Sequence, residues 1–214
     1  MHFLLALFLS LPAAAEMPLP SYKEELATAA WVEVNTLVEV GRYDEAIARA
    51  DKYQKNVAAD AGLEYLIGFS YRMKSEFEPA ELHLRKAVEM DPTRKDAWSD
   101  LGEILLAAER YDEAREAFVK VDELLTRGRY AWIGPFRLGE LAAHQHRPEE
   151  FEEHIREALR RGFSFRTIEQ DPNWKKFYAD PTMRNSLEKL ITVYGDVKIL
   201  DSLRAEPGST QGAG

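Results

Sequence analysis

Hydrophobic residues recur along this chain at the spacing of an amphipathic helix. In one well-defined stretch, Leu63, Ile67 and Tyr71 lie four residues apart and therefore share one helical face. A second apolar face follows over residues 80–88, and Pro92 ends it, because the residue before a proline disfavours the helical conformation. The pattern predicts an all-α chain in which short helices follow one another in pairs.

The paired pattern repeats along the chain. Residues 41–46 (GRYDEA), 75–80 (SEFEPA) and 109–114 (ERYDEA) are alike and begin 34 residues apart each time. A fixed period of this length indicates a solenoid, in which each helix pair stacks on the next. A fourth, weaker copy follows a three-residue insertion and contributes Leu138, Gly139, Ala142, Phe151, Ile155 and Ala158. We expect the four copies at residues 27–60, 61–94, 95–128 and 132–165.

Small residues recur at the same period. Gly68, Gly102 and Gly139 form one column, and alanines such as Ala80 and Ala114 form another. A glycine in mid-helix costs about 1 kcal/mol relative to alanine. That cost is tolerable where a neighbouring helix must come close, so the column predicts close contacts between helices.

The repeated positions resemble the tetratricopeptide repeat pattern, W-x2-L-G-x2-Y followed by A-x3-F, A and P. The third copy has Trp98, Leu101, Gly102, Leu105, Ala114 and Phe118, and the second has Ile67, Gly68, Tyr71, Ala80, Leu84, Ala87 and Pro92. The first copy departs from the pattern, with Glu33 where a buried aliphatic residue is expected. The resemblance implies an α-solenoid of stacked antiparallel helix hairpins, whose first helices line a concave groove that binds protein segments.

The sequence after the repeats predicts a helical cap over residues 166–204. Asp171-Pro172 and Asp180-Pro181 each combine an N-cap residue with a proline suited to the first helical turn. Because a stacked array leaves its last apolar face open, an amphipathic segment must cover it. The residues expected to do so are Trp174, Phe177, Leu187 and Leu190. Residues 205–214, rich in glycine and small polar residues, are expected to be a disordered tail.

The N-terminal residues have a different composition. An apolar run over residues 3–11 is followed by three alanines at 13–15, which is typical of a secretory signal peptide. We therefore expect residues 1–15 to be cleaved, the protein to be periplasmic or secreted, and residues 16–26 to lead into the first helix. A buried N-terminal helix is the alternative. The run is too short to span a bilayer, and no later stretch is apolar enough to do so.

Composition excludes several functions. The chain has 214 residues, no cysteine and a formal net charge of −9. An acidic chain is poorly suited to nucleic acid, which needs clustered lysine and arginine, or to an anionic membrane surface. Without cysteine there is no disulfide framework, thiol catalysis or thiolate metal site.

No catalytic or cofactor motif is present in the sequence, so we expect a protein that is not an enzyme and binds no cofactor. A metal site built from His144, His146, His154 and Glu150 is the one alternative considered. A polar, solvated turn explains these residues better, and no metal is expected.

Side chains on the first helix of each copy that are neither core nor outer surface are the candidate groove residues. Those selected are Trp31, Asn35, Tyr65, Phe69, Arg72, Met73, Glu103, Phe136 and Glu140. An apolar stripe outside the core suggests an interaction site, in which aromatic anchors carry most of the binding energy.

The chemistry of these positions points to one kind of partner. Glu103 and Glu140 would oppose a carboxylate, so the expected partner is an apolar or aromatic protein segment that carries a basic residue. The alternative is that the stripe of Tyr65, Phe69 and Met73 is covered by the chain's own N-terminal segment or by a second copy in a homodimer.

Overall fold

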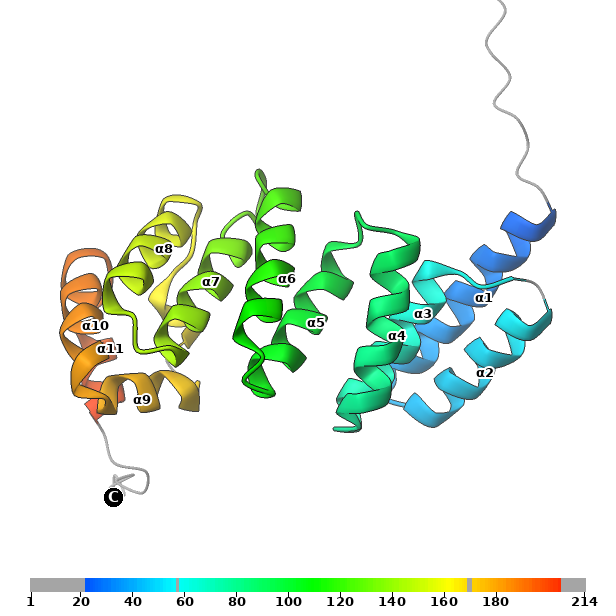
Figure 1. Cartoon of the computed structure of the whole chain (residues 1–214), viewed down its shortest axis with the longest axis horizontal. Coiled ribbons are helices and arrows are strands. Elements are labelled where there is room, and N and C mark those ends of the chain that lie inside the picture. The colour runs from blue at the N-terminus through cyan, green and yellow to red at the C-terminus, as the bar shows by residue number, and fades with distance from the viewer. Residues whose placement is uncertain (1–21, 57, 169–170, 205–214) are drawn as a thin grey trace, which may run out of the picture.

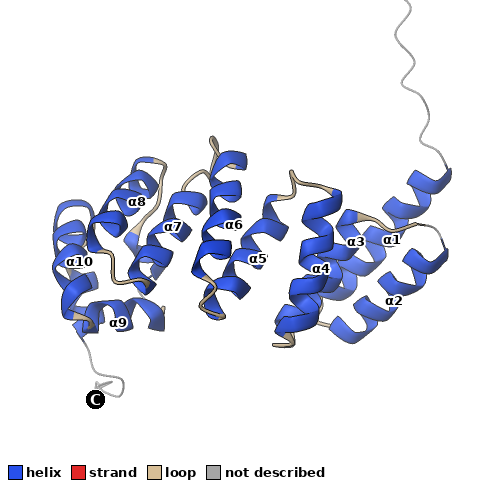
Figure 2. Cartoon of the chain, in the orientation of Figure 1, coloured by secondary structure: helices blue, strands red, loops and turns tan. Residues whose placement is uncertain are grey.

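The computed structural model describes residues 22–56, 58–168 and 171–204, and within these residues it contains helices and no β-strand (Figure 2). The helices of the repeats are α1 (Tyr22–Glu39), α2 (Tyr43–Asn56), α3 (Ala61–Met73), α4 (Phe77–Met90), α5 (Lys95–Ala107), α6 (Tyr111–Leu124), α7 (Ile133–His144) and α8 (Pro148–Arg160). A 3-10 turn (Phe165–Ile168) leads to α9 (Pro172–Ala179), α10 (Pro181–Tyr194) and α11 (Lys198–Arg204). The predicted all-α class is confirmed.

Consecutive helices pair into hairpins, and the hairpins stack in a row (Figure 1). Each of α3, α5 and α7 contacts both its own partner helix and the second helix of the preceding hairpin. The α1–α2 hairpin lies at one end of the row and α9–α11 lie at the other (Figure 1). This arrangement is the predicted α-solenoid.

Some predictions fall outside the described residues. The signal peptide (1–15) and the tail (205–214) lie there entirely, as do residues 16–21 of the segment expected to lead into the first helix. Helix α1 already begins at Tyr22, inside that segment, because residues 22–26 contain no proline or glycine to interrupt the helix. None of the helices in the described residues is long and apolar enough to cross a membrane.

The core runs along the stack in three clusters of buried side chains. The repeating columns lie in it: Val34, Ile67, Leu84 and Phe118 are completely or almost completely buried. Glu33 occupies the column of Ile67 but stays partly exposed, where it pairs with Arg49 at 3.2 Å. It lies in the first hairpin, and within the described residues no earlier hairpin packs on it. An aliphatic residue is therefore not required at this position.

Each hairpin turns through one residue with a left-handed backbone, which explains the repeated phrase found in the sequence. These residues are Gly41 (φ 75°), Ser75 (φ 61°), Glu109 (φ 59°) and His146 (φ 54°). In each turn the next backbone N–H donates to a carbonyl in the last turn of the first helix, for example from Arg110 to Leu105 at 2.9 Å. Gly41 adopts this conformation without the strain that a side chain adds.

The glycine column marks close helix approach, as predicted. A Cβ atom placed on Gly68 would lie 2.8 Å from Leu84 Cγ, and one on Gly102 would lie 2.4 Å from Phe118 Cε1. The same atom on Gly139 would lie 2.6 Å from Ile155 Cδ1. Only glycine lets the two helices of each of these hairpins pack at this separation.

The C-terminal helices close the apolar end of the array. The side chains of Asp171 and Asp180 cap α9 and α10, accepting hydrogen bonds from the backbone of Asn173 (2.9 Å) and Thr182 (2.8 Å). Helix α10 packs against α8. The four side chains expected to cover this end, Trp174, Phe177, Leu187 and Leu190, are all buried.

Candidate binding groove

The first helices of the hairpins share one face, here called the groove face, which carries the column Trp31, Tyr65, Ser99 and Phe136. Three hollows lie along it. The Trp31 hollow (about 320 Å³) includes Gly62 and Arg94, the Tyr65 hollow (about 290 Å³) includes Asp100, and the Phe136 hollow (about 270 Å³) includes Arg137. Ser99 and Ile133 line both the second and the third hollow, so these two are neighbours.

The aromatic stripe predicted from the sequence lies on this face, but it is only partly open. The rings of Tyr65 and Phe69 are half-buried and tilted, with centroids 6.0 Å apart, and both also pack against the core. Trp31 and Met73 are exposed. Asn35 uses its amide to donate to Glu39 at 2.7 Å.

Phe136 and Glu140 require a correction, since each is only 6% exposed rather than open to a partner. The Phe136 ring packs against Phe163 (4.7 Å between centroids) and stacks on Trp174 (5.7 Å). The chain after the repeats folds back over these side chains, which the repeat pattern alone does not reveal. Phe136 and Glu140 line the Phe136 hollow.

A ladder of alternating charges crosses the groove face from α3 to α7. Arg72 pairs with Asp100 (3.2 Å) and with Glu103 (3.0 Å). Arg137 pairs with Glu103 and, at 2.6 Å, with Glu140. The sequence analysis did not identify Arg137 as a groove residue. The only sign of its position in the sequence is that it follows Phe136 and aligns with Asp100 in the repeat. Because Glu103 and Glu140 already have arginine partners, their repulsion of a carboxylate is weaker than the sequence suggested.

Asp100 is the most unusual member of this ladder, because it is only 8% exposed and its Oδ2 atom has no hydrogen-bond partner. Burial raises the pKa of its carboxyl to about 7; Arg72 opposes this rise and Glu103 adds to it. At neutral pH the group is therefore divided between its charged and neutral forms.

The histidines considered for a metal site have separate partners. His146 pairs with Asp180, and His154 Nε2 lies 3.9 Å from Glu150 Oε1. The rings of His144 and Phe177 lie perpendicular to each other, with centroids 5.0 Å apart. The described part of the chain holds no group of three or more His, Asp or Glu side chains placed to bind a metal ion.

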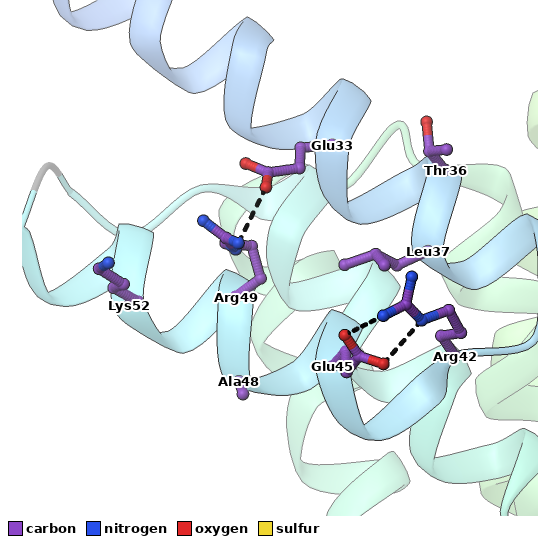
Figure 3. A pocket seen from close by; sticks show the side chains of 8 residues that line it. All are labelled: Glu33, Thr36, Leu37, Arg42, Glu45, Ala48, Arg49 and Lys52. Carbon is purple, nitrogen blue, oxygen red and sulfur yellow. Dashed lines mark hydrogen bonds and ion pairs between the residues drawn. The ribbon is translucent and has the colours of Figure 1, made fainter.

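A fourth hollow, with a volume of about 670 Å³, lies away from the groove face, between α1 and α2 (Figure 3). Its basic side chains are largely neutralised within the hollow. Arg42 donates to both oxygens of Glu45 at 2.6 and 2.5 Å, and Arg49 pairs with Glu33 at 3.2 Å (Figure 3).

Comparisons with known proteins agree with this architecture. The family model described as tetratricopeptide repeat matches residues 74–131. An uncharacterized protein of Methanocaldococcus jannaschii is 32% identical over 90 residues, which cover 41% of this chain and 92% of that protein. This chain belongs to the tetratricopeptide repeat family.

Solved tetratricopeptide structures share the same fold at low sequence identity. PilF of Pseudomonas aeruginosa is 15% identical with a TM-score of 0.65, covering 85% of this chain and 83% of that chain. MamA of Desulfovibrio magneticus is 14% identical with a TM-score of 0.62, covering 85% and 98%. YrrB, described as a tetratricopeptide protein with an unusual peptide-binding site, is 18% identical with a TM-score of 0.60, covering 86% and 100%. At these identities the likeness concerns the fold alone.

A tetratricopeptide array is an architecture for contacts between proteins, and members of the family are generally scaffolds that do not catalyse reactions. In this tetratricopeptide protein the groove face presents hollows, aromatic side chains and fixed charges.

Proposed function

We propose that this protein is a scaffold or assembly factor that holds an extended segment of a partner protein along the groove face. The observation that carries the proposal is the row of hollows, each lined by one aromatic member of a single repeat column: Trp31, Tyr65 and Phe136. Successive side chains of a bound segment can enter successive hollows. The peptide-binding site ascribed to YrrB, which has the same fold, supports this use of a tetratricopeptide array.

The expected partner segment is apolar or aromatic and carries a basic residue. Trp31 on α1 and Met73 on α3 offer exposed apolar surface, and the half-buried rings of Tyr65 and Phe69 add to it. The chain has a net charge of −9, which favours the approach of a cationic partner.

Replacing both Tyr65 and Phe69 by alanine tests the groove. We expect the double variant to bind partners at least about 30-fold more weakly, since truncating aromatic anchors costs roughly 2 kcal/mol or more. Affinity capture with the purified protein, followed by mass spectrometry, measures the loss. The matched control replaces Leu82 and Val119, exposed apolar residues on α4 and α6, by alanine and should leave capture unchanged.

Because Tyr65 and Phe69 also pack against the core, folding of the double variant must be checked by thermal melting. Trp31→Ala combined with Met73→Ala provides a second variant at exposed positions. Recovery of the same partners in the same amounts by both variants would mean that the groove face is not the binding surface. Light scattering on the purified protein tests the alternative: a dimer that dissociates in these variants would assign the stripe to self-association.

Export remains part of the proposal and rests on residues 1–15 of the sequence. We expect the mature protein to begin at Glu16 and to be recovered from the periplasm or the medium. N-terminal sequencing of the protein isolated from cell fractions measures this directly. A cytoplasmic protein that still begins with Met1 would contradict it.

A further inference from the structure

The Tyr65 hollow is built by parts of the chain that are far apart in sequence. Tyr65 comes from α3 and Asp100 from α5, while Leu125 and Tyr130 come from the connection between α6 and α7. Ile133, at the start of α7, completes an apolar wall. The volume of about 290 Å³ is enough for one large side chain and too small for a folded element.

One charged group of this wall is buried and incompletely satisfied. Asp100 uses its Oδ1 atom to pair with Arg72 at 3.2 Å, while its Oδ2 atom has no hydrogen-bond partner. Buried polar atoms nearly always have partners, because leaving one unpaired costs free energy. Asp100 therefore brings to the lining of this hollow a carboxyl group that its ion pair with Arg72 satisfies only in part.

The combination of an apolar wall and a buried carboxyl specifies the occupant. Lysine and arginine side chains have an apolar stem and a cationic head that donates several hydrogen bonds. The Tyr65 ring is also suited to a cation, since Arg94 already lies over it at 5.9 Å. A carboxylate occupant would instead face Asp96 and Asp100, whose two carboxylates outnumber the single cation of the same lining, Lys95.

We propose that the Tyr65 hollow is the anchor pocket for a lysine or arginine side chain of the segment held on the groove face. The head of that side chain pairs with the Asp100 carboxyl group, and its stem lies against Tyr65, Leu125 and Ile133. This assignment rests on the proposed function and adds to it the residue type that the partner must carry.

Binding in this pocket should depend on pH. Burial raises the pKa of Asp100 to about 7, Arg72 and Arg137 act to lower it, and Glu103 and Asp96 act to raise it. A cation binds the ionised carboxyl and not the neutral one. The ionised fraction is about a tenth at pH 6 and about nine tenths at pH 8, so affinity should rise about tenfold between these values.

The test uses N-acetyl-lysine N-methylamide as a probe and N-acetyl-norleucine N-methylamide as the uncharged control, each titrated into the full chain. Backbone amide shifts in the NMR spectrum should change around Ser99, Asp100 and Ile133 with the lysine probe at millimolar concentration. Asp100→Asn should weaken the lysine probe at least about tenfold and remove its pH dependence. It should leave the norleucine probe unchanged. Leu125→Phe, which fills the hollow without altering charge, should block both probes.

Equal binding of the two probes, or no shift with either, would overturn the pocket assignment. The Phe69→Ala variant separates this outcome from failure of the proposed function, because Phe69 does not line the hollow. If Phe69→Ala still weakens partner capture while the lysine probe does not bind, the groove face is supported as the binding surface and the lysine pocket is contradicted. If Asp100→Asn abolishes binding of the lysine probe while partner capture is unaffected by every groove variant, the pocket is supported and the scaffold function is contradicted.

Discussion

Replacing Trp174 by alanine is expected to lower the free energy of unfolding by about 3–5 kcal/mol, the usual cost of removing a fully buried aromatic side chain. The indole has no exposed surface. It contacts the rings of Phe136, Phe151 and Phe177, with centroids 5.7, 5.9 and 5.8 Å away. Because Phe136 belongs to α7 and Phe151 to α8, this one side chain joins the last hairpin to the C-terminal helices.

The loss of stability in the Trp174→Ala variant should be confined to one end of the array. Stacked repeats contact only their neighbours, and the core around Trp174 forms a cluster of its own, next to a cluster that Leu138 and Leu141 of α7 share with the second and third hairpins. Hydrogen exchange should therefore show earlier opening of α7–α11 than of α3–α6 in the alanine variant. Urea unfolding followed by circular dichroism measures the overall change. A uniform loss of protection along the chain would contradict this view of the array.

Trp174→Phe is the matched control. The Nε1 atom of Trp174 is buried with no hydrogen-bond partner, so phenylalanine keeps an aromatic ring and removes an unsatisfied donor. We expect this variant to retain most of the stability that alanine loses. A phenylalanine variant as unstable as the alanine variant would contradict the view that the aromatic contacts of this side chain carry its stabilising effect.

The sequence predicted the array well because each structural requirement repeats. The phrase at residues 41–46 recurs because every hairpin turns in the same way. The glycine column recurs because the second, third and fourth hairpins each bring their two helices too close for a side chain at this position. The paired Asp171-Pro172 and Asp180-Pro181 predicted two helix starts for the same reason, since capping is a local property.

The groove was predicted less completely because its environment depends on contacts that do not repeat. The column containing Trp31 and Tyr65 lies on one face of the array, but the same column includes Phe136, which the chain after the repeats covers. Arg137 escaped notice because its pairing with Glu103 joins residues 34 positions apart on different helices. Such pairs become visible only when the hairpins are assembled in space.

A further close contact holds the third and fourth hairpins together, outside the glycine column. Gly134 lies in the first turn of α7 and faces the backbone of Asp122 in α6. A Cβ atom on Gly134 would lie 2.4 Å from Asp122 Cα and 2.7 Å from Asp122 N. Backbone atoms within a helix cannot rotate away, so any side chain here must push the two hairpins apart.

Gly134→Ala is therefore expected to destabilise the protein by about 1–3 kcal/mol, the usual cost of overpacking, despite alanine's higher helix propensity. Gly62→Ala is the control, because its Cβ atom would meet only side-chain atoms, Trp31 Cδ1 at 2.9 Å and Asp60 Oδ1 at 3.0 Å, which can move aside where the Asp122 backbone cannot. We expect Gly62→Ala to be close to neutral in urea unfolding. Since Ile133 borders the Tyr65 hollow, Gly134→Ala should also weaken binding there. Equal stability of the two variants would contradict this expectation. It would show that α6 and α7 can move apart without a cost in free energy, and that their close approach does not fix the shape of the Tyr65 hollow.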